Sequence, residues 1–375
     1  MRKIALNLLL LLASLVLCLA LLELTLRAFY PQSLGISYQT RDGLRILRPN
    51  YSGYYRGVET LQTFSTNSEG MRDREHTVHK PEGILRIMVL GDSFVEALQV
   101  GFEHSFPRLL EERLGQLLHR DVEVLNAGVS GWGTDDELTY LERYGQRFRP
   151  ELVLIAMTLT NDVNDNLAER YHSMEGNALH AKPAHQIPWM EYKLWQLRSY
   201  LAAHSHFYQL VRLAWHARGM KIQGEELMDQ VADQIRKEPS ARIIEGWKLT
   251  SGLLRQIQSA SGQIGARMAV FLIPLSIQLD RSKYADFLKT HHLSEDSIVL
   301  GKPQTLMKEF GCDQNMEVID LLPGFLAWQQ ENGRPLFLKK DGHWNEEGHR
   351  VAAEIVSRAI FSGSLLVPRE NKADE

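Results

Sequence analysis

Short apolar runs of strand length, separated by stretches with helical spacing, most constrain how this 375-residue chain can fold. Each run is rich in branched residues and is bounded by polar or turn-forming residues. Because continuous apolar runs are typical of strands buried on both faces, their alternation with helices predicts a parallel sheet covered on both sides. The predicted strands are residues 84–92, 122–128, 151–158, 268–274 and 317–321, and the predicted helices are 105–118, 135–148 and 345–360.

The composition is that of an ordinary globular protein, with 44% hydrophobic and 23% charged residues, and it allows a sizeable core. The formal net charge is −4 and there is no long basic run, so we expect no nucleic-acid partner. Of the two cysteines, Cys18 lies in an apolar segment and Cys312 stands alone, so we expect no disulfide within the chain.

The N-terminus carries an apolar run, Ile4–Leu22, that contains only two polar residues. A membrane-spanning helix needs about 20 such residues, whereas a cleaved signal peptide has roughly 7–15 before a small-residue cleavage site. Cleavage after Ala20 is the alternative, but the apolar run continues past it, which favours an uncleaved signal-anchor. Because Arg2 and Lys3 precede the run, we expect the start of the chain in the cytoplasm and the rest in the periplasm or outside the cell.

The sequence suggests four parts: a signal-anchor (1–28), an extension of short strands or loops (29–83), an α/β domain (84–362) and a polar tail (363–375). Within the α/β domain, we expect residues 163–260 to form a helical insertion without strands. Its aromatic and basic residues recur at roughly helical spacing, which favours helices that pack on the domain. A lid over the functional site, or a surface that rests on a membrane, is the alternative.

Polar motifs follow the predicted strands, at the edge where open α/β sheets collect functional groups. The motif "GDSF" places Ser93 at a strand-to-helix turn, and "TLTND" places Asn161 just past the third strand. A glycine-rich loop, "NAGVSGWGT", follows the second strand. After the final strand comes "DGHWN", which contains Asp341 and His343.

These residue types are the parts of a serine-dependent acyl-transfer site. Serine needs a base within hydrogen-bonding reach, and His343 can supply it for Ser93. Asp341, two positions away, can orient the ring and stabilise the imidazolium. Acyl transfer also needs donors aimed at the developing oxyanion, and the Ser93 N–H, a loop glycine N–H and the Asn161 amide would provide three. We therefore interpret Asp341 and His343 as part of a catalytic triad and not as metal ligands.

The four motifs, in this order, resemble the SGNH, or GDSL-type, hydrolase superfamily. The resemblance spans about residues 84–360, and "TFSTNSEGMRD" before it resembles membrane-anchored bacterial members. It implies a three-layer α/β/α fold with a flavodoxin-like parallel sheet, hydrolysis of carboxylic esters, and no metal or organic cofactor. The matching blocks are "GDSF" at 91–94, "NAGVSG" at 126–131, "TND" at 160–162 and "DGHWN" at 341–345.

The resemblance also implies a role for each motif residue. Ser93 would be the nucleophile, and its N–H, with Gly131 and Asn161, would form the oxyanion hole, Gly128 being the fallback glycine. Many members place the aspartate three residues before the histidine, where this chain has Lys340. The two-residue spacing of Asp341 resembles members that act on acyl groups of exopolysaccharides. A second departure is the Leu-Thr pair that precedes Asn161 in place of the usual glycine.

Other residues near the motifs have simpler interpretations. Asn345 is a plausible cap for the last helix, and His349, on that helix, is expected at the surface or in packing. Trp132 and Trp344 flank the proposed site and would either shape an acyl or sugar pocket or pack in the core.

The sequence leaves three functions open. An O-acetylesterase that acts on a carbohydrate or another surface ester is favoured. An acyltransferase would use the same residues, with a hydroxyl of a cell-surface polysaccharide replacing water. A non-catalytic glycan-binding or assembly protein would require a damaged triad.

Overall fold

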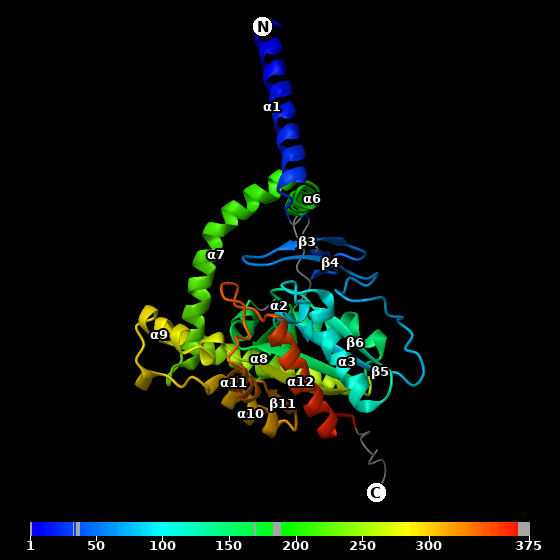
Figure 1. Cartoon of the computed structure of the whole chain (residues 1–375), viewed down its shortest axis with the longest axis vertical. Helices are drawn as coiled ribbons and strands as arrows, with labels where there is room; N and C mark the ends of the chain where they lie inside the picture. Colours follow the sequence, from blue (N-terminus) through cyan, green and yellow to red (C-terminus); the bar gives the residue numbers. More distant parts are fainter. Residues whose placement is uncertain (1, 33, 35–37, 169, 183–188, 367–375) are drawn as a thin grey trace.

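Five parallel strands form the central sheet of the computed structural model, which describes residues 2–32, 34, 38–168, 170–182 and 189–366 (Figure 1). Their spatial order is β11-β10-β7-β5-β6. Numbered along the chain, this is the order 2-1-3-4-5, which is flavodoxin-like and confirms the predicted fold class. The strands are β5 (Leu85–Gly91), β6 (Val122–Gly128), β7 (Leu152–Thr158), β10 (Arg267–Ile273) and β11 (Glu317–Asp320).

Helices cover both faces of this sheet, as the alternating pattern predicted. The helices of the α/β domain are α2 (Ser93–Glu96), α3 (Phe106–Leu118), α4 (Thr134–Arg143), α5 (Asp162–Asn166), α8 (Ala241–Gln263), α9 (Arg281–Thr290), α10 (Lys302–Asp313), α11 (Leu322–Asn332) and α12 (Glu346–Ser362). Short 3₁₀ turns are η1 (Phe102–His104), η2 (Gly145–Phe148), η3 (Ser276–Gln278), η4 (Glu295–Ser297) and η5 (Ser364–Leu366).

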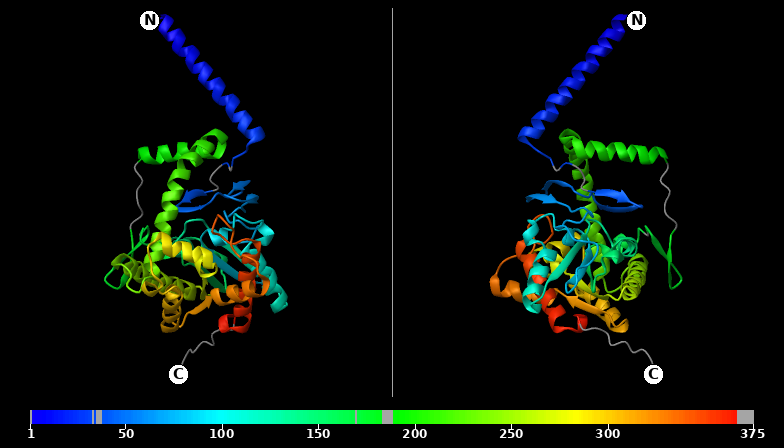
Figure 2. Two further views of the ribbon diagram at one scale, coloured as in Figure 1. Left: turned by 60° about the vertical axis from the view of Figure 1, so that its left-hand side comes forward. Right: turned by 90° about the vertical axis from the view of Figure 1, so that its right-hand side faces the viewer.

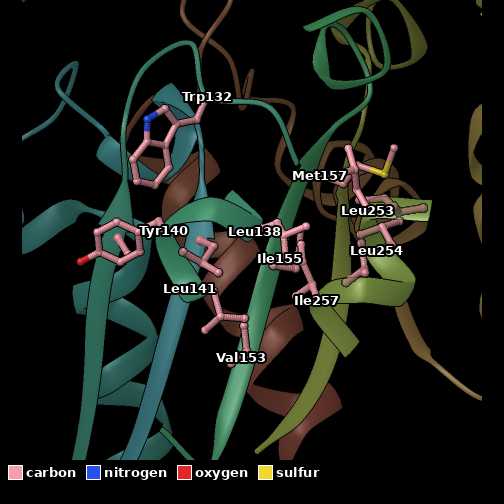
Figure 3. Close-up of a cluster of buried hydrophobic side chains, with 14 of the residues drawn as sticks. Trp132, Leu138, Tyr140, Leu141, Val153, Ile155, Met157, Leu253, Leu254 and Ile257 are labelled. Atoms are coloured by element: carbon pink, nitrogen blue, oxygen red, sulfur yellow. The ribbon is translucent and has the colours of Figure 1, made fainter. Parts of the chain in front are cut away.

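Two hydrophobic clusters form the core, one on each face of the sheet. One cluster joins α4 and α8 to the sheet, and Figure 3 shows Leu138, Ile155 and Ile257 from these elements packed together. The other joins α3, α11 and α12, with Phe106 and Phe325 fully buried. Since alternate side chains of β5 enter opposite clusters, its run of apolar residues is explained by burial on both faces.

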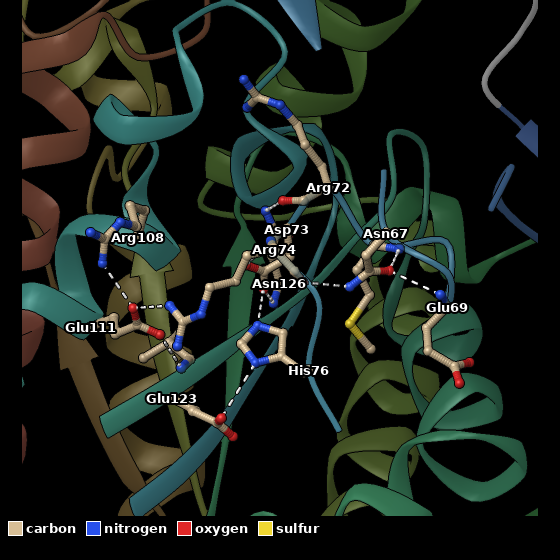
Figure 4. Close-up of polar contacts among 12 residues, drawn as sticks. Asn67, Glu69, Arg72, Asp73, Arg74, His76, Arg108, Glu111, Glu123 and Asn126 are labelled. Carbon is tan, nitrogen blue, oxygen red and sulfur yellow. Dashed lines mark hydrogen bonds and ion pairs between the residues drawn. The ribbon is translucent and has the colours of Figure 1, made fainter. Parts of the chain in front are cut away.

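The extension before the sheet folds into two antiparallel hairpins, made of β1 (Tyr38–Arg41) with β2 (Leu44–Leu47) and of β3 (Ser52–Arg56) with β4 (Leu61–Ser65). The segment after β4 is bound to the end of β6 (Figure 4). There Asp73 Oδ2 accepts from Asn126 N at 2.9 Å, and Asn126 Nδ2 donates to the Arg72 carbonyl at 3.2 Å. These bonds attach the extension directly to the α/β domain.

Residues 163–260 differ from the strand-free insertion that the sequence suggested. The hairpin of β8 (His172–Glu175) and β9 (Ala178–Ala181) lies within them, so the expectation of no strands was wrong. Its strands are only four residues long, too short for an alternating pattern to stand out. Helix α8 also packs on the sheet as the crossover before β10.

Three further helices are α1 (Arg2–Phe29), α6 (Trp189–His204) and α7 (His206–Ile235), of which α1 and α6 lie at one end of the molecule (Figures 1 and 2). Helix α1 projects away from the α/β domain, and its stretch Lys3–Phe29 is long and apolar enough to cross a membrane. Helix α6 runs crosswise at the level where α1 ends, and α7 leads from there back to the domain.

Candidate active site

Ser93 lies at the turn between β5 and α2, and its side chain is partly exposed. Asp92 caps α2 and holds the turn, because its Oδ1 accepts from the Phe94 N–H at 2.9 Å. The Ala97 backbone ends the helix after one turn in the left-handed conformation. The strand end and this short helix therefore present Ser93 at the carboxyl edge of the sheet.

The structure brings His343 and Asp341 to this serine from 250 residues along the chain. His343 Nε2 lies 2.7 Å from Ser93 Oγ, and the other ring nitrogen, Nδ1, contacts Asp341 Oδ1. The two-residue spacing places the Asp341 carboxylate in contact with the His343 ring, because Gly342 between them adopts a positive φ of 81°. A side chain at that position would be strained. The three side chains thus form one continuous chain of contacts.

The loop that carries this pair is held by residues that the sequence did not identify. Glu59, in the turn between β3 and β4, accepts from the backbone N–H groups of Lys340 (2.7 Å) and Asp341 (3.2 Å) through Oε1. On the opposite side, the Phe94 ring lies 4.9 Å from the His343 ring, centroid to centroid. No spacing in the sequence relates Glu59 to a loop more than 280 residues away, so only the fold could reveal this contact.

Asn161 lies beside the serine turn, after the end of β7. Its Nδ2 donates to Asp165 Oδ2 at 2.7 Å and is 3.4 Å from Asp92 Oδ2. An amide nitrogen carries two hydrogens; one makes the short bond to Asp165, and the other makes the long contacts to Asp92 and, at 3.5 Å, to Asp162 Oδ1. Asp162 stabilises the same loop by accepting from Thr158 N at 2.8 Å.

The loop after β6 brings Gly131 to the same edge. Val129 N donates to the Gly91 carbonyl at 3.0 Å, and Ser130 N donates to the buried Glu96 carboxylate at 2.6 Å. Gly131 has φ +74°, a conformation that favours glycine. Within the described part of the chain, neither the Ser93 N–H nor the Gly131 N–H donates a hydrogen bond.

The fallback glycine, Gly128, has a different environment. A Cβ atom built there would lie 2.5 Å from Val95 Cβ and 2.6 Å from Glu96 N. The close approach of β6 to α2 therefore requires glycine at this position for packing.

Behind the serine turn lies a group of buried carboxyls, Asp92, Glu137 and Asp162. Burial raises the pKa of each. Nearby carboxylates raise the pKa further, Asp92 and Asp136 that of Glu137, and Asp92 and Glu137 that of Asp162. Neither carboxyl oxygen of Glu137 has a hydrogen-bond partner among the described residues. A protonated Glu137 is the form that this environment favours.

Several residues near the motifs serve packing. Trp132 and Trp344 are both 1% exposed, so they belong to the core and do not line an open pocket. His349 is also buried; its Nδ1 accepts from Phe106 N at 3.2 Å, and burial lowers its pKa to about 3. Asn345 caps α12 as predicted, accepting from Gly348 N at 2.9 Å.

A hollow on the described surface lies elsewhere, at the amino ends of the strands, where its lining includes Leu85, Arg267 and Glu317. It contains none of the predicted site residues. A hollow is a common place for a binding site, but the serine whose partner histidine contacts a carboxylate is found at the opposite edge of the sheet.

A family model for the GDSL-like lipase/acylhydrolase family matches residues 89–351, which is most of the chain. The chain belongs to this family. The resemblance inferred from the four motifs is thereby confirmed, and Ser93, Gly131, Asn161, Asp341 and His343 lie within the matched range. Lipases and acylhydrolases cleave acyl groups from their carrier molecules, so family membership and the chemistry of the site agree in kind.

Individual relatives of this GDSL-like protein are distant. An arylesterase from Vibrio mimicus is 38% identical over 73 residues, which are 19% of this chain and 36% of that protein. The matched segment thus spans about a third of the relative. Among solved structures, an acetyl xylan esterase is 14% identical over 74% of this chain and 100% of its own, with a TM-score of 0.40. A lipase/acylhydrolase from Enterococcus faecalis is 14% identical over 74% and 95%, with a TM-score of 0.39.

Proposed function

We propose that this protein is a serine esterase in which Ser93, His343 and Asp341 form the catalytic triad. The observation that carries the proposal is the 2.7 Å contact between Ser93 Oγ and His343 Nε2, with Asp341 against the other ring nitrogen. A hydroxyl within hydrogen-bonding distance of an oriented imidazole is the arrangement that activates a serine.

The reaction follows from these positions. Ser93 Oγ attacks the carbonyl carbon of the ester while His343 Nε2 takes its proton. The imidazolium that forms is stabilised by Asp341 and returns the proton to the leaving alcohol. Water, deprotonated by the same ring, then attacks the acyl-serine and releases the carboxylic acid. The cycle restores the free serine and needs only water as co-reactant.

The negative charge on the tetrahedral intermediate needs donors at the serine turn. We assign this role to the backbone N–H groups of Ser93 and Gly131 and to the second N–H of Asn161 Nδ2. Asp165 is suited to hold the Asn161 amide in place, since it accepts the other hydrogen at 2.7 Å. Each such donor typically contributes about 3–4 kcal/mol to lowering the barrier.

For the substrate we propose an acetyl ester on a carbohydrate at the cell surface. Two features support this choice: the apolar α1, which would hold the domain at a membrane facing the periplasm or the exterior, and the Asp-x-His spacing, which resembles members acting on exopolysaccharide acyl groups. An acetyl group is small and needs no large acyl pocket, which agrees with the burial of the neighbouring Trp132 and Trp344 in the core.

The test uses the full chain in mild detergent with p-nitrophenyl esters of increasing acyl length and with O-acetylated polysaccharide. We expect hydrolysis that is fastest for the acetyl ester, and acetate release from the polysaccharide. Ser93→Ala and His343→Ala should each lower kcat on the order of 10⁴-fold or more. A serine-reactive phosphonate should label the wild type at Ser93 only.

Ser130→Ala is the matched control, because Ser130 lies on a neighbouring loop but bonds to Glu96 and not to His343. The esterase proposal is wrong if wild type and both triad variants are equally inactive and the phosphonate leaves Ser93 unmodified.

A further inference from the structure

The last turns of α1 extend beyond its apolar run. The run ends at Leu22, and Glu23 is the first charged residue after it. A run from Ile4 to Leu22 spans roughly 28 Å as a helix, which is about the thickness of the hydrocarbon layer. If α1 crosses a bilayer, as our proposed function assumes, Glu23 lies where hydrocarbon gives way to lipid headgroups.

The corner between α6 and α7 is hydrogen-bonded to α1 near Glu23. The Glu23 carboxylate accepts from the backbone N–H groups of His206 (2.8 Å) and Phe207 (2.9 Å) and from Ser205 Oγ (2.9 Å). One turn further on, Arg27 donates to the His204 carbonyl at 2.7 Å. Four hydrogen bonds thus fix the end of α6 and the start of α7 against the end of α1.

Helix α6 carries large apolar side chains that face solvent in the isolated chain. The exposed ones are Trp189 (68%), Met190 (64%), Leu194 (48%), Leu197 (54%) and Tyr200 (61%). Met190, Leu194 and Leu197 follow the four-three spacing of one helix face. Figures 1 and 2 show α6 lying across the level at which α1 ends, with α7 departing from its C-terminal end.

We infer that α6 lies in the surface layer of the bilayer that α1 crosses, with its apolar side chains among the lipid acyl chains near the headgroups. Tryptophan and tyrosine favour this layer because they combine an apolar ring with a polar group. The exposed Lys193 and Arg198 on the same helix suit the negative phosphates of anionic lipids. The inference makes α6 a second membrane contact, parallel to the membrane plane.

The bilayer is favoured as the occupant because of the Glu23 attachment. A soluble partner protein or a second copy of the chain would leave these aromatic side chains at headgroup depth without lipid contact. The hydrogen bonds to Glu23 and Arg27 instead place α6 at the depth of the lipid headgroups. At this depth its apolar and aromatic side chains can contact acyl chains while its polar groups remain among the headgroups.

The experiment follows the environment of α6 directly in the full chain. In a Cys18→Ser, Cys312→Ser background, a single cysteine replaces Leu197 and carries an environment-sensitive NBD dye. The protein is reconstituted into phosphatidylcholine vesicles that contain phosphatidylglycerol, with and without lipid that bears a quenching nitroxide near the headgroup. Leu194→Cys repeats the measurement one turn away. Leu326→Cys, 44% exposed on α11 of the α/β domain, is the matched control.

We expect the dye at 197 and at 194 to shift its emission to shorter wavelength and to lose most of its intensity to the nitroxide lipid, while the dye at 326 does neither. Water-like emission at all three positions, in protein that floats with the vesicles, overturns the inference and leaves the α1 anchor standing. A blue shift without quenching indicates contact with protein and also overturns it. Protein that fails to float with the vesicles contradicts the anchor itself, and the inference with it.

Discussion

Asp341 is the member of the proposed triad whose position departs most from the usual family spacing, and its contact with His343 Nδ1 predicts that it still orients the ring. Asp341→Asn should lower kcat by about 10²- to 10⁴-fold and leave KM nearly unchanged, because an amide does not select the tautomer that can take the serine proton. The measurement is steady-state hydrolysis of a soluble aryl acetate. Lys340→Ala is the control, since that side chain occupies the alternative position three residues before the histidine. A larger loss for Lys340→Ala than for Asp341→Asn would contradict the assignment.

The raised pKa of the buried Glu137 leads to a prediction about how the stability of the protein depends on pH. Burial raises its pKa, so the folded protein retains a proton that the unfolded chain releases above about pH 4.3. Its contribution to stability is therefore complete below that pH and is lost as the pH rises toward the folded-state pKa. Glu137→Gln removes this titration, and thermal unfolding between pH 5 and pH 9 should show a shallower decline than the wild type, by roughly 1.4 kcal/mol for each unit of pKa shift removed.

Asp92 and Asp162 titrate in the same direction and remain in that variant, so the decline becomes smaller but does not vanish. Glu142→Gln, an exposed change on the same helix, should leave the pH profile as it is in the wild type. Equal slopes for Glu137→Gln and the wild type would show that Glu137 is ionised in the folded protein.

At the scale of the element, α2 depends on a buried arginine from the extension. Arg72 is 1% exposed, and its guanidinium donates to the carbonyls of Glu96 (2.9 Å), Ala97 (2.5 Å) and Val100 (2.6 Å), at the end of the helix that begins with Ser93. Arg72→Met keeps much of the volume but leaves these carbonyls without the donor. We expect a loss of roughly 3 kcal/mol in the free energy of unfolding and a lower kcat.

Denaturant unfolding monitored by far-UV circular dichroism measures the first effect, and aryl acetate turnover at a temperature where the variant is folded measures the second. Arg48→Met, an exposed change in the same extension, should alter neither. Unchanged stability for Arg72→Met would show that α2 is held by its other contacts.

The elements differ in how much of them the sequence could predict. The strands of the sheet were predictable because burial on both faces requires a continuous run of apolar residues. The predicted strand at residues 122–128 coincides with β6. Ser93, His343 and Asp341 were predictable as a group because their chemistry is specific and their motifs are short. The roles of Arg72 and Glu59 could not be predicted, since each side chain bonds to backbone atoms far away in the sequence. Every residue has such backbone atoms, so these contacts leave no pattern of residue types at the partner positions.

At the scale of the whole molecule, one hairpin connects the end of α1 with the candidate active site. Arg56 of β3 donates to the Pro31 carbonyl at 3.3 Å, just after α1, and Glu59 bonds the Asp341 loop. These two residues are three positions apart, and three residues of extended chain span at most about 11 Å. The carboxyl edge of the sheet therefore faces the end of the molecule from which α1 departs (Figure 1). This arrangement supports the proposed substrate, an ester group at the surface of the membrane that α1 is proposed to cross.

The same arrangement predicts a defined topology in a bacterial inner membrane. Arg2 and Lys3 should keep the N-terminus cytoplasmic, and α1 continues unbroken through Ala20 to Phe29, which leaves no extended segment for a signal peptidase. Mass spectrometry of the mature protein should find residues 2–20 still attached, and protease added to spheroplasts should degrade the α/β domain. Replacing both cations, Arg2→Glu with Lys3→Glu, should increase the protected fraction, because the orientation depends on the charge difference across α1. A mature N-terminus at Leu21 would refute the anchor, and a fully protected wild-type domain would refute its orientation.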